Sequence, residues 1–113
     1  MQDLTKEFSK DQIDRAYDAI ELAKKSGKIK KGINEVTKVI ERGQAKFVAI
    51  ARDTNPPEII MHIPPLCEEK AVFFVIVPSK EDLGAVAGLQ VGTSAVAIVT
   101  EGDAKEVIKR IIK

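Results

Sequence analysis

Four polar side chains between residues 34 and 42 have the spacing of one helix face. Asn34, Lys38 and Arg42 follow the i, i+4, i+8 row of an α-helix, and Glu35 lies beside the first of them. Lysine and arginine can bind phosphate oxygens, an amide can both donate to and accept from a base edge, and a carboxylate can accept only from exposed N–H groups such as those of guanine. A carboxylate within a basic surface repels phosphate, so its presence favours a role in reading a base. An amphipathic helix with ordinary surface charges explains the same residues, and the sequence leaves both interpretations open.

The segment around this ridge is strongly basic. The 113-residue chain has a net charge of only +1, but residues 24–52 hold nine basic and two acidic side chains, and the flanking segments are each net acidic. Local potential steers binding, so this block favours a polyanionic partner, although a solvated lysine-rich face gives the same count. Lys31 and Gly32 come directly before the predicted helix, whose N-terminus would offer unpaired N–H groups to phosphate oxygens.

A second segment with unusual side chains follows residue 79. Lys80 lies at the start of another predicted helix, and the loop 89–93 carries the apolar residues Leu89 and Val91 where polar turn residues are typical. These side chains can cover an unstacked RNA base or pack back onto the sheet, and the two alternatives have equal support. Aromatic residues are scarce, which disfavours a stacking platform for bases.

Alternating helices and strands must position these segments. Capping and periodicity predict a helix from the Ser9–Gln12 capping box to Gly27, and others over 32–43, from Pro56, over 64–70, over 79–88 and from Asp103. Buried strands are predicted over 47–51, 72–77 and 95–99, with only a stub of strand at 28–30. We therefore expect a single α/β domain over 1–113: a three-layer α/β/α sandwich with a mixed, mostly four-stranded central sheet. Ile59 and Ile60 are expected to face inward from the helix that follows Pro56.

Catalytic and metal sites are not supported by the residue types present. The chain has one histidine, His62, and one cysteine, Cys67, which are too few for a zinc site and exclude an internal disulfide. We interpret His62 as a helix-terminal or half-buried residue and Cys67 as a small core residue. The glycines form no phosphate-binding loop, and no apolar run reaches the length of a membrane span. We expect a cytoplasmic, non-enzymatic protein without cofactor or metal.

Several motifs resemble one known family. They are Lys30-Lys31-Gly32-Ile33-Asn34-Glu35-Val36-Thr37-Lys38, the later Glu41-Arg42-Gly43, Pro56-Pro57-Glu58-Ile59, and the run from His62 to Lys70. From about Ala16 to Lys113 the chain is similar to archaeal large-subunit ribosomal proteins of the L-seven-Ae type. This resemblance implies a single α/β/α domain that binds kink-turn and kink-loop RNA, in which two sheared G·A pairs flank a sharply bent three-nucleotide bulge.

The resemblance also implies roles for individual residues. Asn34 and Glu35 would read the guanines of the sheared pairs, with backbone contacts from Lys38 and Arg42 beside them. The remaining implied contacts are a second phosphate contact from Lys80, an apolar cover over the bulge from Leu89 and Val91, and a pocket for the flipped-out nucleotide lined by Ile59 and Asn55. This sequence departs from the family pattern at Ile33, at Arg52 and in the loop 90–93.

The implied partners are ribosomal RNA, guide RNA and ribonuclease P RNA. The resemblance places such a protein in the archaeal large ribosomal subunit, in box C/D and H/ACA guide ribonucleoproteins with their scaffold proteins, and in the ribonuclease P that acts in tRNA processing. We expect a monomer in the free state. Two alternatives remain: a protein-docking adaptor that uses the Leu89 loop and the last helix, and an α/β domain that binds a small molecule at the carboxyl ends of its strands.

Overall fold

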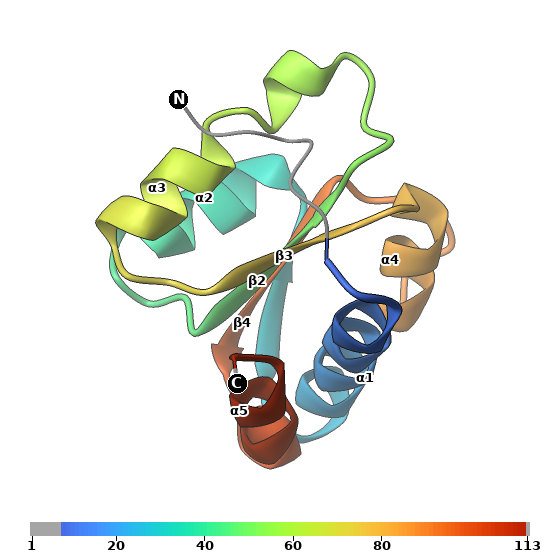
Figure 1. The fold of residues 1–113 in the computed structure, drawn as a ribbon, viewed down its shortest axis with the longest axis vertical. Helices are drawn as coiled ribbons and strands as arrows, with labels where there is room; N and C mark the ends of the chain where they lie inside the picture. Colours follow the sequence, from blue (N-terminus) through green and yellow to red (C-terminus); the bar gives the residue numbers. More distant parts are fainter. Residues whose placement is uncertain (1–7, 113) are drawn as a thin grey trace.

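The computed structural model describes residues 8–112 as eleven elements in alternating order (Figure 1). They are α1 (Lys10–Ser26), β1 (Lys28–Lys31), α2 (Ile33–Glu41), β2 (Phe47–Ala51), the 3₁₀ turn η1 (Pro57–Ile59), α3 (Ile63–Glu69), β3 (Phe74–Val77), α4 (Lys80–Val86), β4 (Ala95–Thr100), the 3₁₀ turn η2 (Gly102–Ala104) and α5 (Lys105–Ile112). No helix in this part of the chain is both long and apolar enough to cross a membrane.

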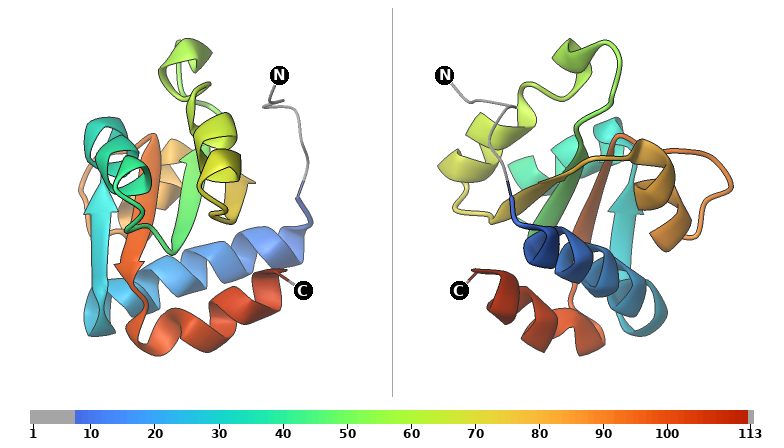
Figure 2. Two further views of the ribbon diagram at one scale, coloured as in Figure 1. Left: turned by 90° about the vertical axis from the view of Figure 1, so that its left-hand side faces the viewer. Right: turned by 45° about the vertical axis from the view of Figure 1, so that its right-hand side comes forward.

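The four strands form one mixed sheet in the order β1-β4-β2-β3. β2 and β3 are parallel, whereas β4 runs antiparallel to both β1 and β2 (Figure 2). β1, β2 and β3 therefore all end at the same edge of the sheet, where β4 begins. We call this side the C-terminal edge and define it by Lys31, Ala51, Val77 and Ala95. The stub expected at 28–30 is a strand of four residues that pairs with β4.

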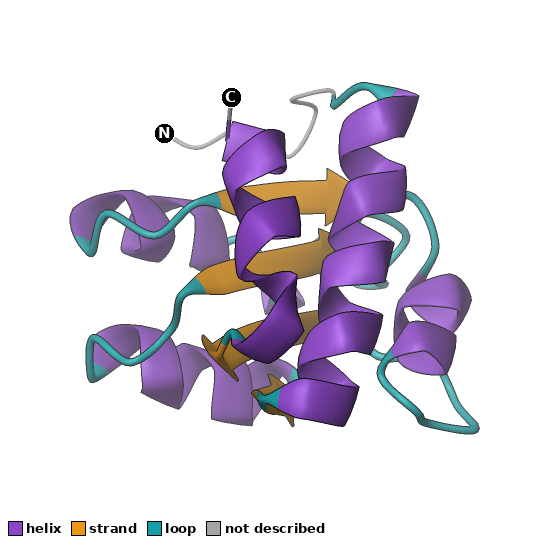
Figure 3. Ribbon diagram, turned by 90° about the horizontal axis from the view of Figure 1, so that it is seen from below, coloured by secondary structure: helices purple, strands orange, loops and turns teal. Residues whose placement is uncertain are grey.

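Helices cover both faces of the sheet, which confirms the predicted three-layer sandwich. Phe47, Ala49 and Ala51 of β2 pack with α1, α4 and α5, while Val48 and Ile50 pack with α2 and α3. Figure 3 shows α1 and α5 side by side across one face. All five residues of β2 are buried because each face of this central strand is covered by helices.

The helix starts follow the capping chemistry of the sequence. The Ser9 hydroxyl accepts from the Gln12 N–H, and the Gln12 side chain accepts from the Ser9 N–H, both at 3.0 Å, so the predicted capping box is present. The Ser79 hydroxyl accepts from the Asp82 N–H at 3.2 Å at the start of α4. These contacts fix two of the helices that pack on the sheet.

The helix predicted from Pro56 is wrong: only the 3₁₀ turn η1 forms there. The prolines would be tolerated in the first turn of an α-helix, but the N–H groups that follow donate to i−3 carbonyls: that of Ile60 donates to Pro57 at 3.1 Å and that of Met61 to Glu58 at 3.4 Å. Successive side chains of such a turn point about 120° apart. Ile60 is therefore buried while Ile59 is 39% exposed, so the expectation that both face inward holds for Ile60 alone.

Strand β3 begins two residues later than predicted, at Phe74. The cause is the end of α3, where Ala71 adopts a φ of +58° and the Val72 N–H donates to the Cys67 carbonyl at 2.8 Å. This 6→1 bond satisfies a terminal helix carbonyl and withdraws Val72 from strand pairing.

Cys67 is fully buried on the inner face of α3, as predicted for a core residue. Burial, with a smaller contribution from Glu68, raises the pKa of its thiol from 9.0 to about 12. The native thiol therefore stays protonated at pH values where the unfolded chain ionises, and stability is lost as the pH rises above about 9. We expect the free energy of unfolding to fall by up to about 1.4 kcal/mol per pH unit in this range. Urea unfolding from pH 8 to 10.5 should show this slope in the parent and a shallower one in Cys67→Ala; equal slopes would contradict the assignment.

Candidate nucleic-acid interface

Four segments that the sequence singled out converge on the C-terminal edge (Figure 1). α2 follows β1, the segment 52–62 follows β2, α4 follows β3, and the loop 89–94 leads into β4. Backbone hydrogen bonds hold the junctions together: the Gly32 N–H donates to the Ala95 carbonyl at 3.0 Å, and the Ala51 N–H donates to the Ser94 carbonyl at 2.9 Å. Residues distant in sequence thus share one side of the molecule.

The start of α2 lacks a side-chain cap among the described residues. Its N-cap is Gly32, with a φ of +92° and a ψ of 150°, a backbone conformation that glycine adopts without steric cost. In contrast to the serine caps of α1 and α4, no side-chain oxygen here occupies the first-turn N–H groups. The helix dipole adds positive potential at the same point. This end of α2 can therefore accept an anionic oxygen.

The predicted polar ridge lies on the exposed face of α2, opposite the buried Val36 and Ile40. Asn34 and Glu35 are exposed in the first turn, Lys38 lies one turn further, and Arg42 is the C-cap. The Lys38 ammonium lies 3.9 Å from the Glu35 carboxylate, and both side chains are more than half exposed. An ion pair so accessible to water is worth only about 0 to 1 kcal/mol, so both groups remain available to a ligand.

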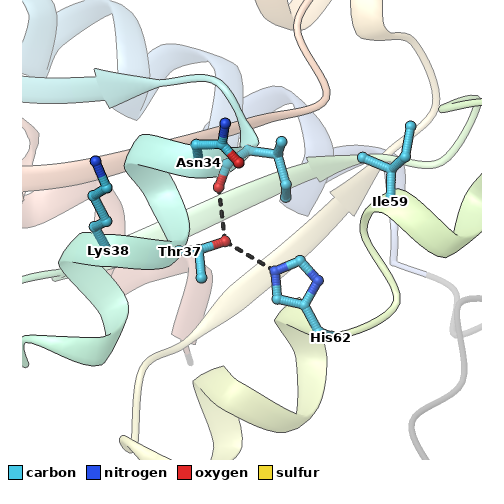
Figure 4. Close-up of a pocket in the computed structure, with 6 residues that line it drawn as sticks. Asn34, Thr37, Lys38, Ile59 and His62 are labelled. Atoms are coloured by element: carbon cyan, nitrogen blue, oxygen red, sulfur yellow. Dashed lines mark hydrogen bonds between the residues drawn. The ribbon is translucent and has the colours of Figure 1, made fainter.

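A shallow cavity of about 650 Å³ opens between α2 and the start of α3 (Figure 4). The Thr37 hydroxyl donates to the Ile33 carbonyl at 2.7 Å and lies 2.9 Å from His62 Nε2. Since the Thr37 hydroxyl proton is directed to the Ile33 carbonyl, the Thr37 oxygen is left to accept from His62 Nε2. His62 is an exposed N-cap of α3, which agrees with its helix-terminal interpretation. The lining side chains are Ile33, Asn34, Thr37, Lys38, Ile59 and His62.

The pocket residues implied by the resemblance are only partly brought together. Ile59 lines the cavity beside α2, whereas Asn55 is exposed but is not part of the cavity lining. The sequence pattern did not indicate Thr37 or His62 as site residues. The one sequence feature that could have indicated Thr37 is its spacing, since it lies three residues after Asn34 and therefore near it on the helix face.

The second predicted segment lies on the other side of the C-terminal edge. Lys80 is exposed at the first position of α4, and its carbonyl accepts from the Thr93 N–H at 3.0 Å. In the loop, the Val91 side chain is 70% exposed, whereas the Leu89 side chain is half-buried and therefore less accessible. The two apolar residues of the loop thus differ in their exposure to solvent. Residues of α4 and of the loop also line a smaller hollow of about 200 Å³.

The basic block of residues 24–52 is not one surface. Lys31 ends β1 at the C-terminal edge, but Lys28 pairs opposite Thr100 at the far end of the same strand. Lys46 also lies at that far end, since its N–H donates to the Ile98 carbonyl. Only part of the positive charge therefore surrounds the start of α2. Among residues 8–112, no group of three or more metal-binding side chains comes together.

The alternative docking surface of the Leu89 loop and the last helix is divided in the fold. α1 packs against both α4 and α5 and lies between them (Figure 1). The loop and α5 therefore do not form one continuous face.

Comparison with known proteins places this architecture in a family. The profile described as "Ribosomal protein L7Ae/L30e/S12e/Gadd45 family" matches residues 14–108. Among solved structures, the chain is similar to the Giardia lamblia 15.5kD RNA binding protein, with 29% sequence identity and a TM-score of 0.89. The superposition covers 99% of this chain and 94% of that one. The family match spans most of the sequence, and the chain belongs to the ribosomal protein L7Ae/L30e/S12e/Gadd45 family.

Proposed function

We propose that this protein is a non-catalytic RNA-binding protein that captures kink-turn and kink-loop RNA at the start of α2. The observation that carries the proposal is the uncapped helix N-terminus that presents Asn34 and Glu35 beside Lys38. The family membership and the similarity to an RNA-binding protein of the same fold support it.

The proposed mechanism separates affinity from discrimination. The first-turn N–H groups of α2 bind phosphate oxygens together with Lys31, Lys38 and Arg42, and these contacts position the RNA. Asn34 and Glu35 contact guanine edges that sheared G·A pairs leave exposed, which selects the kinked form. A protein that binds only this form shifts the RNA equilibrium by its differential affinity, so binding and RNA folding are one event.

A second set of contacts comes from the opposite side of the C-terminal edge. In this proposal the exposed Lys80 binds the backbone of the bent strand, and the exposed Val91 covers the bulge together with the half-buried Leu89. Ile59, which lines the cavity beside α2, and the exposed Asn55 are proposed to hold the flipped-out nucleotide. The kink brings two backbone segments together, and two contact regions on one face match such a shape.

The proposed RNA targets are ribosomal, guide and ribonuclease P RNAs. We propose that the protein binds these RNAs within the archaeal large ribosomal subunit, within box C/D and H/ACA guide particles together with their scaffold proteins, and within ribonuclease P. All of these complexes would lie in the cytoplasm. We propose that the free protein is one monomeric RNA-binding domain over residues 1–113.

A titration with matched RNAs tests the proposed function. Gel-shift affinities should be measured for a kink-turn RNA and for the same RNA with both G·A pairs replaced by G·C pairs. Each lost base contact costs about 1 to 3 kcal/mol, so two replaced pairs should weaken binding by tens of fold or more. Equal affinity for the two RNAs would refute the proposal.

Replacing Lys38 by Ala should change the salt dependence of binding. Each phosphate contact contributes about −0.7 to −0.9 to the slope of log K against log salt concentration, so the variant should have a slope shallower by roughly that amount. Affinities at four or more salt concentrations measure it. Lys46→Ala removes the same charge at the far end of the sheet and should retain the parent slope. A Lys38→Ala slope equal to that of Lys46→Ala would exclude a phosphate contact at Lys38.

A further inference from the structure

A carboxylate in the turn after β2 connects two segments of the proposed interface. Asp53 Oδ1 accepts from the backbone N–H of Lys80 at 2.8 Å, although the residues are 27 positions apart in sequence. The turn itself is closed tightly: the buried Thr54 donates from its hydroxyl to the Ala51 carbonyl at 2.8 Å, and the Arg52 N–H donates to the Val77 carbonyl. Asp53 is therefore held in place by the sheet and in turn holds the first residue of α4.

The backbone of Lys80 passes this constraint to the loop 89–93. Its carbonyl accepts from the Thr93 N–H at 3.0 Å, and the loop packs closely against α4. A Cβ on Gly92 would lie 3.0 Å from Lys80 Cγ, and a Cβ on Gly84 would overlap the Val91 carbonyl. The glycines thus permit a close approach that leaves Val91 70% exposed. One chain of contacts runs from Asp53 through Lys80 to the loop.

The negative charge of Asp53 is unfavourable for RNA binding at this position. An exposed carboxylate beside Lys80 repels the phosphates that Lys80 is proposed to bind. A hydrogen bond from a backbone N–H to an ionised acceptor is stronger than one to a neutral acceptor, so the carboxylate is well suited to fixing the start of α4. The geometry favours a role in which Asp53 acts through Lys80.

We propose that Asp53 is a positioning residue for RNA binding, which sets the location of Lys80 and of the Val91 loop relative to α2. This inference rests on the proposed function, because the positioned groups are the second contact region for the RNA.

Two substitutions at Asp53 separate positioning from charge. Asp53→Ala removes both the acceptor and the negative charge, whereas Asp53→Asn keeps an acceptor oxygen and removes only the charge. If charge alone mattered, both variants would bind kink-turn RNA more tightly than the parent. Positioning predicts that Asp53→Ala binds on the order of tenfold more weakly, and that Asp53→Asn binds at least as tightly as the parent. Glu58→Ala, which removes an exposed carboxylate from η1, is the matched charge control and should not weaken binding.

The salt dependence distinguishes positioning from a general loss of structure. Asp53→Ala should also lose the phosphate contact of Lys80, which makes its slope of log K against log salt shallower, while Asp53→Asn retains the parent slope. Thermal unfolding establishes that each variant is folded at the temperature of the titration, and amide hydrogen exchange at Lys80 and Thr93 should quicken in Asp53→Ala only.

The outcomes that overturn this inference differ from those that overturn the proposed function. Asp53→Ala that binds as tightly as the parent refutes the positioning role and leaves RNA binding intact. Equal weakening in Asp53→Ala and Asp53→Asn also refutes it, because the retained acceptor then has no effect. If Asp53→Ala does not fold, weaker binding by folded Asp53→Asn refutes it. A parent protein with no preference for the kink-turn over its G·C control removes both the function and this inference.

Discussion

Glu35→Ala is expected to weaken kink-turn binding by about 1 to 3 kcal/mol, the range for a good base contact, even though it removes a negative charge from the surface that we propose binds phosphate. Simple electrostatics predicts the opposite sign. The carboxylate is exposed in the first turn of α2 and lies 3.9 Å from the Lys38 ammonium. Removing it frees Lys38 but, if the proposed base contact exists, deprives the guanine N–H groups of their acceptor. Gel-shift titration of parent and variant at several salt concentrations measures the difference.

Glu41→Ala supplies the matched control for this prediction. Glu41 is an exposed carboxylate at the last position of the same helix, so its removal changes the net charge equally. This variant should bind kink-turn RNA as tightly as the parent or slightly more tightly. If Glu35→Ala behaves like Glu41→Ala, Glu35 contributes charge alone and reads no base.

Gly32→Ala is expected to lower both stability and RNA affinity. A Cβ at this position meets no atom within 4 Å, so the penalty comes from the φ of +92°, which L side chains rarely adopt. Holding a residue with a Cβ in such a conformation costs about 1 to 3 kcal/mol. The backbone can relieve this strain only by moving the start of α2, which carries Asn34 and Glu35. Urea unfolding and gel-shift titration measure the two effects.

Gly43→Ala is a control that introduces backbone strain of the same kind away from the start of α2. Gly43 follows the other end of α2 and has a φ of +72°, and a Cβ added there would likewise meet no atom within 4 Å. This variant should be destabilised by about 1 to 2 kcal/mol, the cost of a left-handed residue, but should bind RNA with parent affinity where it is folded. Equal loss of affinity in both variants would mean that the N-terminal conformation of α2 has no special role.

Local sequence chemistry predicted the elements whose formation depends on near neighbours. The Ser9 capping box, the glycine at the start of α2 and the apolar run Phe47–Ala51 each produced the expected element. The errors arose where backbone geometry overrode the pattern. The segment after Pro56 formed i to i−3 hydrogen bonds and remained a 3₁₀ turn, and the positive φ of Ala71 delayed the start of β3.

The candidate site was predictable to the extent that it lies on one helix. The periodicity of Asn34, Lys38 and Arg42 placed them correctly on the exposed face of α2. The contacts of Asp53 with Lys80 and of Thr37 with His62 join residues 27 and 25 positions apart, and no local pattern encodes such pairs. The basic residues of 24–52 are close in sequence but do not form one surface. Lys31 lies at the C-terminal edge, whereas Lys28, at the other end of the same strand, lies on the far side of the sheet.

A double-mutant cycle between protein and RNA tests the central claim most directly. One guanine of a sheared pair is replaced by 2-aminopurine, which keeps the amino group used in the sheared pair but lacks the N1–H and the O6. If Glu35 contacts this base edge, the replacement should weaken binding to the parent strongly and binding to Glu35→Ala little, a coupling of about 1 kcal/mol or more. Equal losses in parent and variant at each guanine of the two pairs would contradict recognition of guanine by the start of α2.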